Sequence, residues 1–242
     1  MIVIKPNCRV QFTAEDVDFI LKVLGTKIDT ADCLVRLLAD EDTRDPILDD
    51  DALFRAILEL RHCLGISAHF YFYILVRQVL RRAGIADRAV ADYVAEMLAE
   101  FSRTERARCV TPGQTQPLDY FFEMLAALQT ADDATRFLIR AHIGNHSLFL
   151  AGVFPDHIRF RAETRGCPDL HYYENLGRAS YRAASEHRLA RKYEVAEIFD
   201  TLAERFQATR RALNDLGERL FSLGDSEPPV ALVLKHSGPG HV

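Results

Sequence analysis

One segment, residues 134–154, is apolar on nearly every side of a helical wheel, and this constrains the fold more than any other feature. A helix of that kind in a globular protein is usually surrounded by other helices. About 20 apolar residues would also span a bilayer, but two arginines and the polar His142, Asn145 and His146 argue against a membrane span. We therefore expect a buried central helix over 134–154. Its apolar residues include Phe137, Leu138, Ile139, Ile143, Leu148, Phe149, Leu150 and Val153.

Size and charge exclude several classes of protein. The chain has 242 residues, of which 48% are hydrophobic, enough to bury the core of one large domain or two small ones. Its net charge of −5 does not favour a nucleic-acid-binding protein. The five cysteines include no Cys-x-x-Cys pair, and the first residues lack the apolar core of a signal peptide. We expect reduced thiols and a cytoplasmic location.

Helix-capping residues precede apolar runs along most of the chain. Ser67 stands before an apolar run that ends in two arginines and Gly84, which is typical of a capped helix. Gly177, Ser180 and Ala184 recur at helical spacing in a helix from Leu170 to about His187, so a second helix can approach closely there. The pattern predicts an all-α, compact bundle of about nine or ten helices. In this bundle, helices over 67–83, 168–187 and 195–223 surround residues 134–154.

The predicted domain organisation is one helical domain followed by a tail. Residues 1–224 form the domain, and the loop 103–116 is a possible boundary of a sub-lobe. The first dozen residues are β-like, and 40–51 is an acidic loop that leads into a helix at its negatively charged start. Residues 225–242 form an extended C-terminal tail. Its apolar part, 230–234, can dock in a groove of the same or a neighbouring chain.

Two histidines in the central segment are candidate metal ligands. His142 and His146 are four residues apart, so both rings lie on one face of a helix, a spacing that suits zinc or iron. A metal site needs further ligands, and Glu59-x-x-His62 supplies a carboxylate and an imidazole at the spacing used in di-iron bundles. The alternative is a hydrogen-bonded polar cluster in the core, in which Asn145 holds one of the histidines.

A second candidate is a pocket for an aromatic or planar ligand, lined by tyrosines of two predicted helices together with histidine and glutamate. The alternative is that these tyrosines belong to the core and place their hydroxyls at its rim. The candidate residues of this pocket are His69, Tyr73, His171, Glu174 and Tyr181.

A third candidate is an anion-binding loop containing Arg103, Arg106 and Arg108. The alternative is a solvated face with local salt bridges, which would also account for the arginines at 77, 81 and 82. No Gly-x-Ser-x-Gly, P-loop or dinucleotide-binding motif is present in the sequence.

These patterns favour a non-enzymatic cytoplasmic interaction or scaffold protein without a cofactor. We expect a homodimer, because so many apolar helices have more apolar surface than one chain can bury. We also expect possible further protein partners, no nucleic acid and no membrane span. The alternative is a helical enzyme that binds a metal or a small ligand through a buried cluster of histidine, glutamate and tyrosine.

Overall fold

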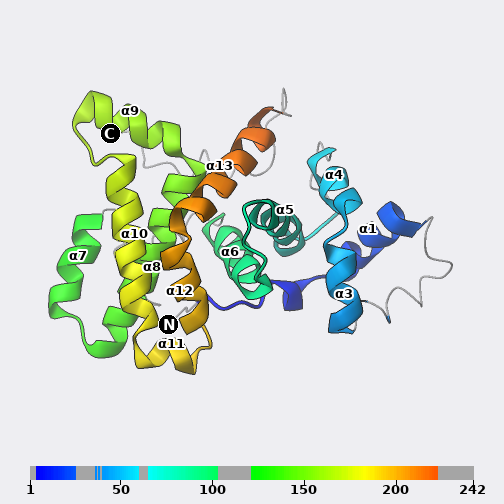
Figure 1. The fold of residues 1–242 in the computed structure, drawn as a ribbon, viewed down its shortest axis with the longest axis horizontal. Helices are drawn as coiled ribbons and strands as arrows, with labels where there is room; N and C mark the ends of the chain where they lie inside the picture. The colour runs from blue at the N-terminus through cyan, green and yellow to red at the C-terminus, as the bar shows by residue number, and fades with distance from the viewer. Residues whose placement is uncertain are drawn as a thin grey trace.

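The computed structural model describes residues 4–25, 36, 38, 40–59, 65–102 and 121–222. Within these ranges it contains twelve α-helices and one short 3-10 helix, η1, and no strand (Figure 1). The all-α prediction is therefore confirmed. The elements are η1 (Cys8–Gln11), α1 (Ala14–Leu24), α3 (Glu41–Leu48), α4 (Asp51–Glu59), α5 (Ala68–Arg82), α6 (Arg88–Phe101), α7 (Phe121–Thr130), α8 (Asp133–Val153), α9 (Pro155–Arg165), α10 (Leu170–Ser185), α11 (Arg188–Lys192), α12 (Ala196–Glu204) and α13 (Phe206–Ser222).

Helices α5 and α6 have the longest unbroken buried runs, 69–80 and 90–101. They lie in the middle of the molecule, with α1, α3 and α4 on one side and α7, α8 and α10 on the other (Figure 1). Both begin at a hydrogen-bonded cap: the hydroxyl of Ser67, the predicted cap, accepts a hydrogen bond from the N–H of Phe70, and the Asp87 carboxylate accepts from the N–H groups of Ala89 and Val90. Their caps and the apolar residues over most of their surfaces explain why these helices occupy the interior.

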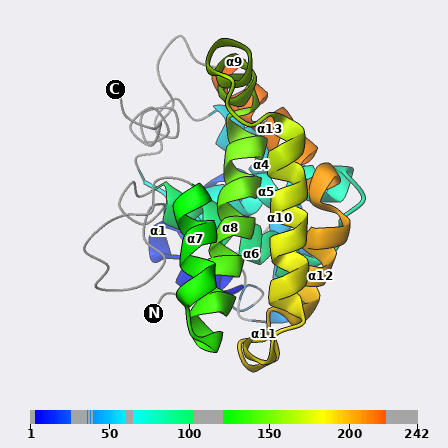
Figure 2. The ribbon, with the colours of Figure 1, turned by 90° about the vertical axis from the view of Figure 1, so that its left-hand side faces the viewer.

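Helix α8, which covers the segment predicted to be central, is not enclosed on every side. It packs against α10, α13 and α7, and in Figure 2 it lies between α7 and α10. Arg136 is exposed, and Arg140, His146 and Leu150 are half-buried. Two of the predicted neighbours, α10 and the α12–α13 region, do pack beside it, whereas the contacts of α5 are mainly with α6, α13, α4 and η1.

Helices α8 and α10 approach each other closely along the row of small residues predicted from the sequence. A Cβ at Gly177 would lie 2.9 Å from the Cβ of Ser147 and would also collide with the Phe206 ring. A Cβ at Gly144 would lie 2.8 Å from the ring of Tyr181. Each helix therefore carries a glycine where the other helix places a side chain.

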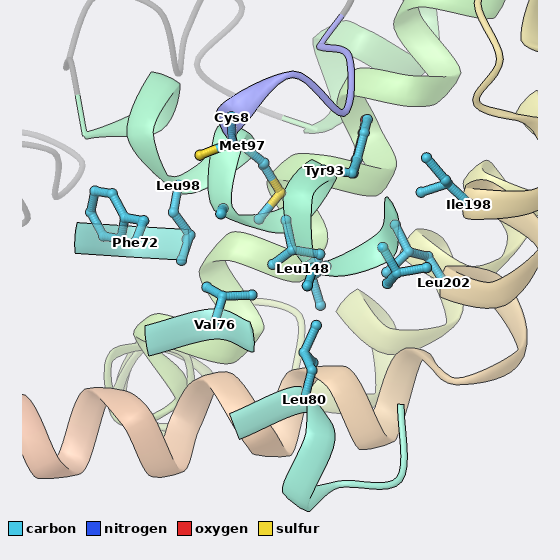
Figure 3. Close-up of a cluster of buried hydrophobic side chains, with 14 of the residues drawn as sticks. Cys8, Phe72, Val76, Leu80, Tyr93, Met97, Leu98, Leu148, Ile198 and Leu202 are labelled. Carbon is cyan, nitrogen blue, oxygen red and sulfur yellow. The ribbon is translucent and has the colours of Figure 1, made fainter. Parts of the chain in front are cut away.

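The main core forms where η1, α5, α6, α8 and α12 meet (Figure 3). Side chains from all five elements contribute to the core, among them Cys8, Val76, Leu80, Tyr93, Met97, Leu148, Ile198 and Leu202.

Within the described residues no helix is long and apolar enough to cross a bilayer.

Three local predictions were wrong. The β-like start contains the 3-10 helix η1. The acidic stretch 40–51 is largely helical, because Asp40 precedes α3, which tolerates Pro46 near its end. The single helix predicted over 195–223 breaks at Arg205, and the break places the Phe206 ring over Gly177. The predicted loop 103–116 and tail 225–242 lie outside the described residues.

Candidate functional site

His142 and His146 share one face of α8, as their spacing predicts, with ring centroids 5.8 Å apart. The ring of His146 stacks on Phe121 of α7 at 5.1 Å, and Phe101 of α6 lies 5.7 Å from the ring of His142. His142 is buried and His146 half-buried. Aromatic rings from two other helices therefore pack against both imidazoles.

The other predicted metal ligands do not lie near this pair in the described part of the chain. Glu59 is an exposed residue at the end of α4, and α4 lies across α5 and α6 from α8 (Figure 1). His62 lies outside the described residues. Among the residues that are described, no group of three histidine, cysteine, aspartate or glutamate side chains could hold a metal ion. The zinc or iron site stays a prediction.

Asn145, between the two histidines, binds two tyrosines. Its Oδ1 accepts hydrogen bonds from the hydroxyls of Tyr93 on α6 at 2.9 Å and Tyr181 on α10 at 2.7 Å. Both phenols are completely or almost completely buried, and burial raises the pKa of each hydroxyl well above its usual value. The tyrosines therefore stay protonated and donate. One amide oxygen thus joins α6, α8 and α10.

The three pocket candidates of α10 have separate surroundings. Tyr181 belongs to the asparagine cluster just described. Glu174 forms an ion pair with Arg210 of α13, with 2.8 Å between Oε1 and Nε. His171 is exposed. Two of the three side chains therefore connect α10 to neighbouring helices.

The remaining two pocket candidates lie on α5. Tyr73 is fully buried, and the guanidinium of Arg9 lies 5.7 Å above its ring. His69 is also buried, with its Nε2 3.5 Å from a carboxylate oxygen of Glu96. The five predicted pocket residues therefore belong to separate groups on α5 and α10. The shared ligand pocket stays a prediction.

The predicted anion-binding residues Arg103, Arg106 and Arg108 lie outside the described residues. The arginines of α5 do form the predicted local salt bridges, but the solvated face is wrong for Arg77, which is buried. Arg77 donates to both carboxylate oxygens of Asp49 at 2.7 and 3.0 Å. Arg81 donates to the backbone carbonyl of the same aspartate at 3.0 Å. These contacts hold the α3–α4 junction against α5.

The sequence analysis missed a buried acidic row on α6. Asp92, Glu96 and Glu100 are only 1%, 6% and 8% exposed. Their spacing of four residues puts them on one helix face. Because apolar residues cover most of the rest of this helix, an acidic row so narrow is a signal that could have been found.

Residues 4–12, which we call the N-terminal strap, pack against the acidic row. The backbone N–H of Arg9 donates to Asp92 at 2.9 Å, and its guanidinium donates to Asp45 at 3.0 Å. Gln11 donates to Glu96 at 2.9 Å. The strap thus supplies donors to carboxylates that would otherwise be costly to bury.

No family model, curated protein or solved structure matches the chain. The site must therefore be interpreted from its own residues.

The pKa values of two carboxylates in this region are shifted in opposite directions. Burial raises the pKa of Asp92, and the hydrogen bonds and charge of Arg9 only partly oppose this effect. Burial also acts on Asp49, but there the hydrogen bond and charge of Arg77, helped by Arg81 and Arg88, outweigh it and hold the pKa below its usual range. One carboxylate therefore stabilises the fold as an anion, whereas the other is penalised for its charge.

His187 has a structural contact at each ring nitrogen. Its Nδ1 accepts the N–H of Leu189 at 3.1 Å, which caps α11. Its Nε2 lies 3.0 Å from Asp133, and the ring stacks on Phe137 at 5.3 Å. A neutral imidazole with the proton on Nε2 satisfies both polar contacts, so this histidine joins α11 to the start of α8.

Proposed function

We propose that this chain is a non-enzymatic interaction or scaffold protein that acts as a homodimer. The observation that carries the proposal is the double hydrogen bond from Tyr93 and Tyr181 to Asn145. These buried polar groups hold three helices together. Polar networks whose members are paired in this way make a core more specific and more rigid.

The ion pairs of the interior support the same proposal. Arg77 with Asp49 joins α5 to the α3–α4 junction, and Arg210 with Glu174 joins α13 to α10. Breaking such a pair costs stability, because one buried charge is left without its partner. Because these charged groups are already paired within the chain, they are poorly placed to bind a substrate. We therefore assign the function to the surface.

We also propose that the protein works in the cytoplasm. The two described cysteines, Cys8 and Cys167, are free thiols. The Cys8 S–H donates to the backbone carbonyl of His69 at 3.2 Å. A reducing compartment preserves both thiols.

The experiment is light scattering coupled to size exclusion, with elemental analysis and an absorption spectrum of the same untagged sample. We expect twice the chain mass of 27.5 kDa, without stoichiometric metal or a chromophore. Stoichiometric zinc, iron or haem would contradict the non-enzymatic proposal and favour the metal-binding enzyme. A monomer throughout the micromolar range would contradict the homodimer.

A further inference from the structure

Two rows of opposite charge lie on neighbouring helices at the surface. Arg178 and Arg182 of α10 form the basic row, and Glu197, Asp200 and Glu204 of α12 form the acidic row. All five residues are exposed. Helices α10 and α12 pack directly against each other, and Figure 2 shows them side by side at the edge of the molecule.

The spacing within each row places its charges together. The two arginines are four residues apart, and the three acids are three and four residues apart, which on a helix puts each set on one face. No ion pair among the described residues uses any of these five side chains. By contrast, the interior charges at Asp49 and Arg77 are paired within the chain. The two rows are therefore available to a partner.

We propose that the α10–α12 face binds a second copy of this chain, with each basic row lying against the acidic row of the other copy. This inference rests on the homodimer proposed above. A two-fold axis running along the helices between the two rows places α10 of one copy over α12 of the other. The same rotation places the second α10 over the first α12, so the charge pairing occurs twice.

The arrangement of charge favours a second copy over other partners. A surface with separate rows of both signs is complementary to itself under a two-fold rotation. A nucleic acid would be attracted by the arginines but repelled by the three carboxylates beside them. Ala179 and Ala183 are also exposed on α10, and side chains this small allow another helix to come close.

The test uses charge reversal and rescue in the full chain. One variant carries Arg178→Glu and Arg182→Glu, and the other carries Glu197→Lys, Asp200→Lys and Glu204→Lys. Each variant alone places like charges opposite each other, so we expect its dimer dissociation constant to rise by at least about tenfold. An equimolar mixture of the two should form a heterodimer, because opposite charges then face each other across both contacts.

The matched control for the arginine variant is Arg55→Glu with Arg165→Glu. It makes the same change in net charge as Arg178→Glu with Arg182→Glu, but at exposed positions of α4 and α9. This variant should dimerise like the wild type. Helix content, measured by circular dichroism, should be unchanged in all variants. If a reversal variant does not fold, the wild-type dimer is measured at a series of salt concentrations instead. Its dissociation constant should rise with ionic strength.

The outcomes separate this inference from the homodimer itself. A wild-type monomer would overturn both. A wild-type dimer that resists both reversals, or that does not weaken with salt, would overturn the α10–α12 face and leave the homodimer standing. Dissociation by both reversals without rescue in the mixture would overturn the charge pairing.

Discussion

Asn145 joins three helices through one buried side chain. Its side-chain oxygen accepts from Tyr93 and Tyr181, which come from two different helices. The ring centroid of Phe199 lies 5.4 Å from the ring centroid of each tyrosine. The hydroxyls therefore have an aromatic surround and depend on this one acceptor.

Replacing Asn145 with alanine should lower the free energy of unfolding by about 2–4 kcal/mol, because two buried hydroxyls lose their acceptor. Denaturation in urea followed by circular dichroism measures the loss. The control is Asn175→Ala, at an exposed position of α10, which should change stability by less than about 0.5 kcal/mol. Equal losses in the two variants would contradict the role assigned to Asn145.

Asp49 and Asp92 should produce opposite pH dependences. The lowered pKa of Asp49 means that its contribution is complete above the unfolded value, about 3.9, and is lost as pH falls through the folded value. The stability difference between wild type and Asp49→Asn should therefore be about 2 kcal/mol at pH 7 and shrink toward pH 2.

For Asp92 the folded pKa is raised, so the charged form is penalised above that value and the penalty disappears as pH falls through it. The stability of the wild type relative to Asp92→Asn should therefore grow as pH decreases. Urea denaturation at a series of pH values measures both variants. Parallel slopes would show that burial and Arg77 do not distinguish the two carboxylates as described.

At the scale of helices, the close packing of α8 and α10 depends on glycines, which leave room for side chains of the neighbouring helix. Gly177 is the closest point between α8 and α10, beneath the Phe206 ring and beside Ser147. The break at Arg205 directs Phe206 into that position. The glycine, the kink and the ring thus form one packing unit.

Gly177→Ala should destabilise the protein by about 1–3 kcal/mol, because the new methyl group overlaps atoms of Phe206 and Ser147. Thermal unfolding measures the change. Gly25→Ala is the matched control: no atom lies within 4 Å of its Cβ, and its φ of −61° suits alanine. A melting temperature unchanged in both variants would contradict the close approach of α8 and α10.

Helices were predicted well where local chemistry alone decides them. Ser67 caps the helix that the sequence assigned to it, and Asp132 caps the helix that covers the predicted segment 134–154. The order of burial was not predicted, because α5 and α6 are more continuously buried than α8, and that depends on which helices pack together. The burial of the acidic row on α6 was not predicted for the same reason: it depends on the strap, far away in sequence.

Of the candidate site, the common face of His142 and His146 followed directly from their spacing. Their packing on Phe101 and Phe121 did not, since those rings come from other helices. Likewise, Asn145 was expected to hold a histidine, whereas it binds two tyrosines. A helical wheel shows which residues share a face but not which neighbours they meet.

At the scale of the whole molecule, the N-terminal strap connects parts that are otherwise separate. Arg9 contacts Asp45 of α3 and Asp92 of α6. Lys5 lies 5.5 Å from the ring of Tyr193, beyond α11. The nine residues of the strap therefore touch both sides of the α5–α6 centre.

Arg9→Ala should lower the free energy of unfolding by about 2 kcal/mol, because Asp45 and Asp92 lose a cationic partner in a partly buried setting. The adjacent Val10→Ala is the control, since Val10 is 85% exposed and should have an effect within about 0.5 kcal/mol. Urea denaturation compares the two. If both variants match the wild type, the strap does not stabilise the fold through Arg9.

The position of the strap has a consequence for synthesis on the ribosome. Arg9 leaves the exit tunnel early, but its partner Asp92 follows 83 residues later. At roughly 5–20 residues per second, the first residues wait several seconds before their binding surface exists. Until α6 has been made, Arg9 lacks its partner Asp92, so the strap completes its contacts only after α6 has left the tunnel.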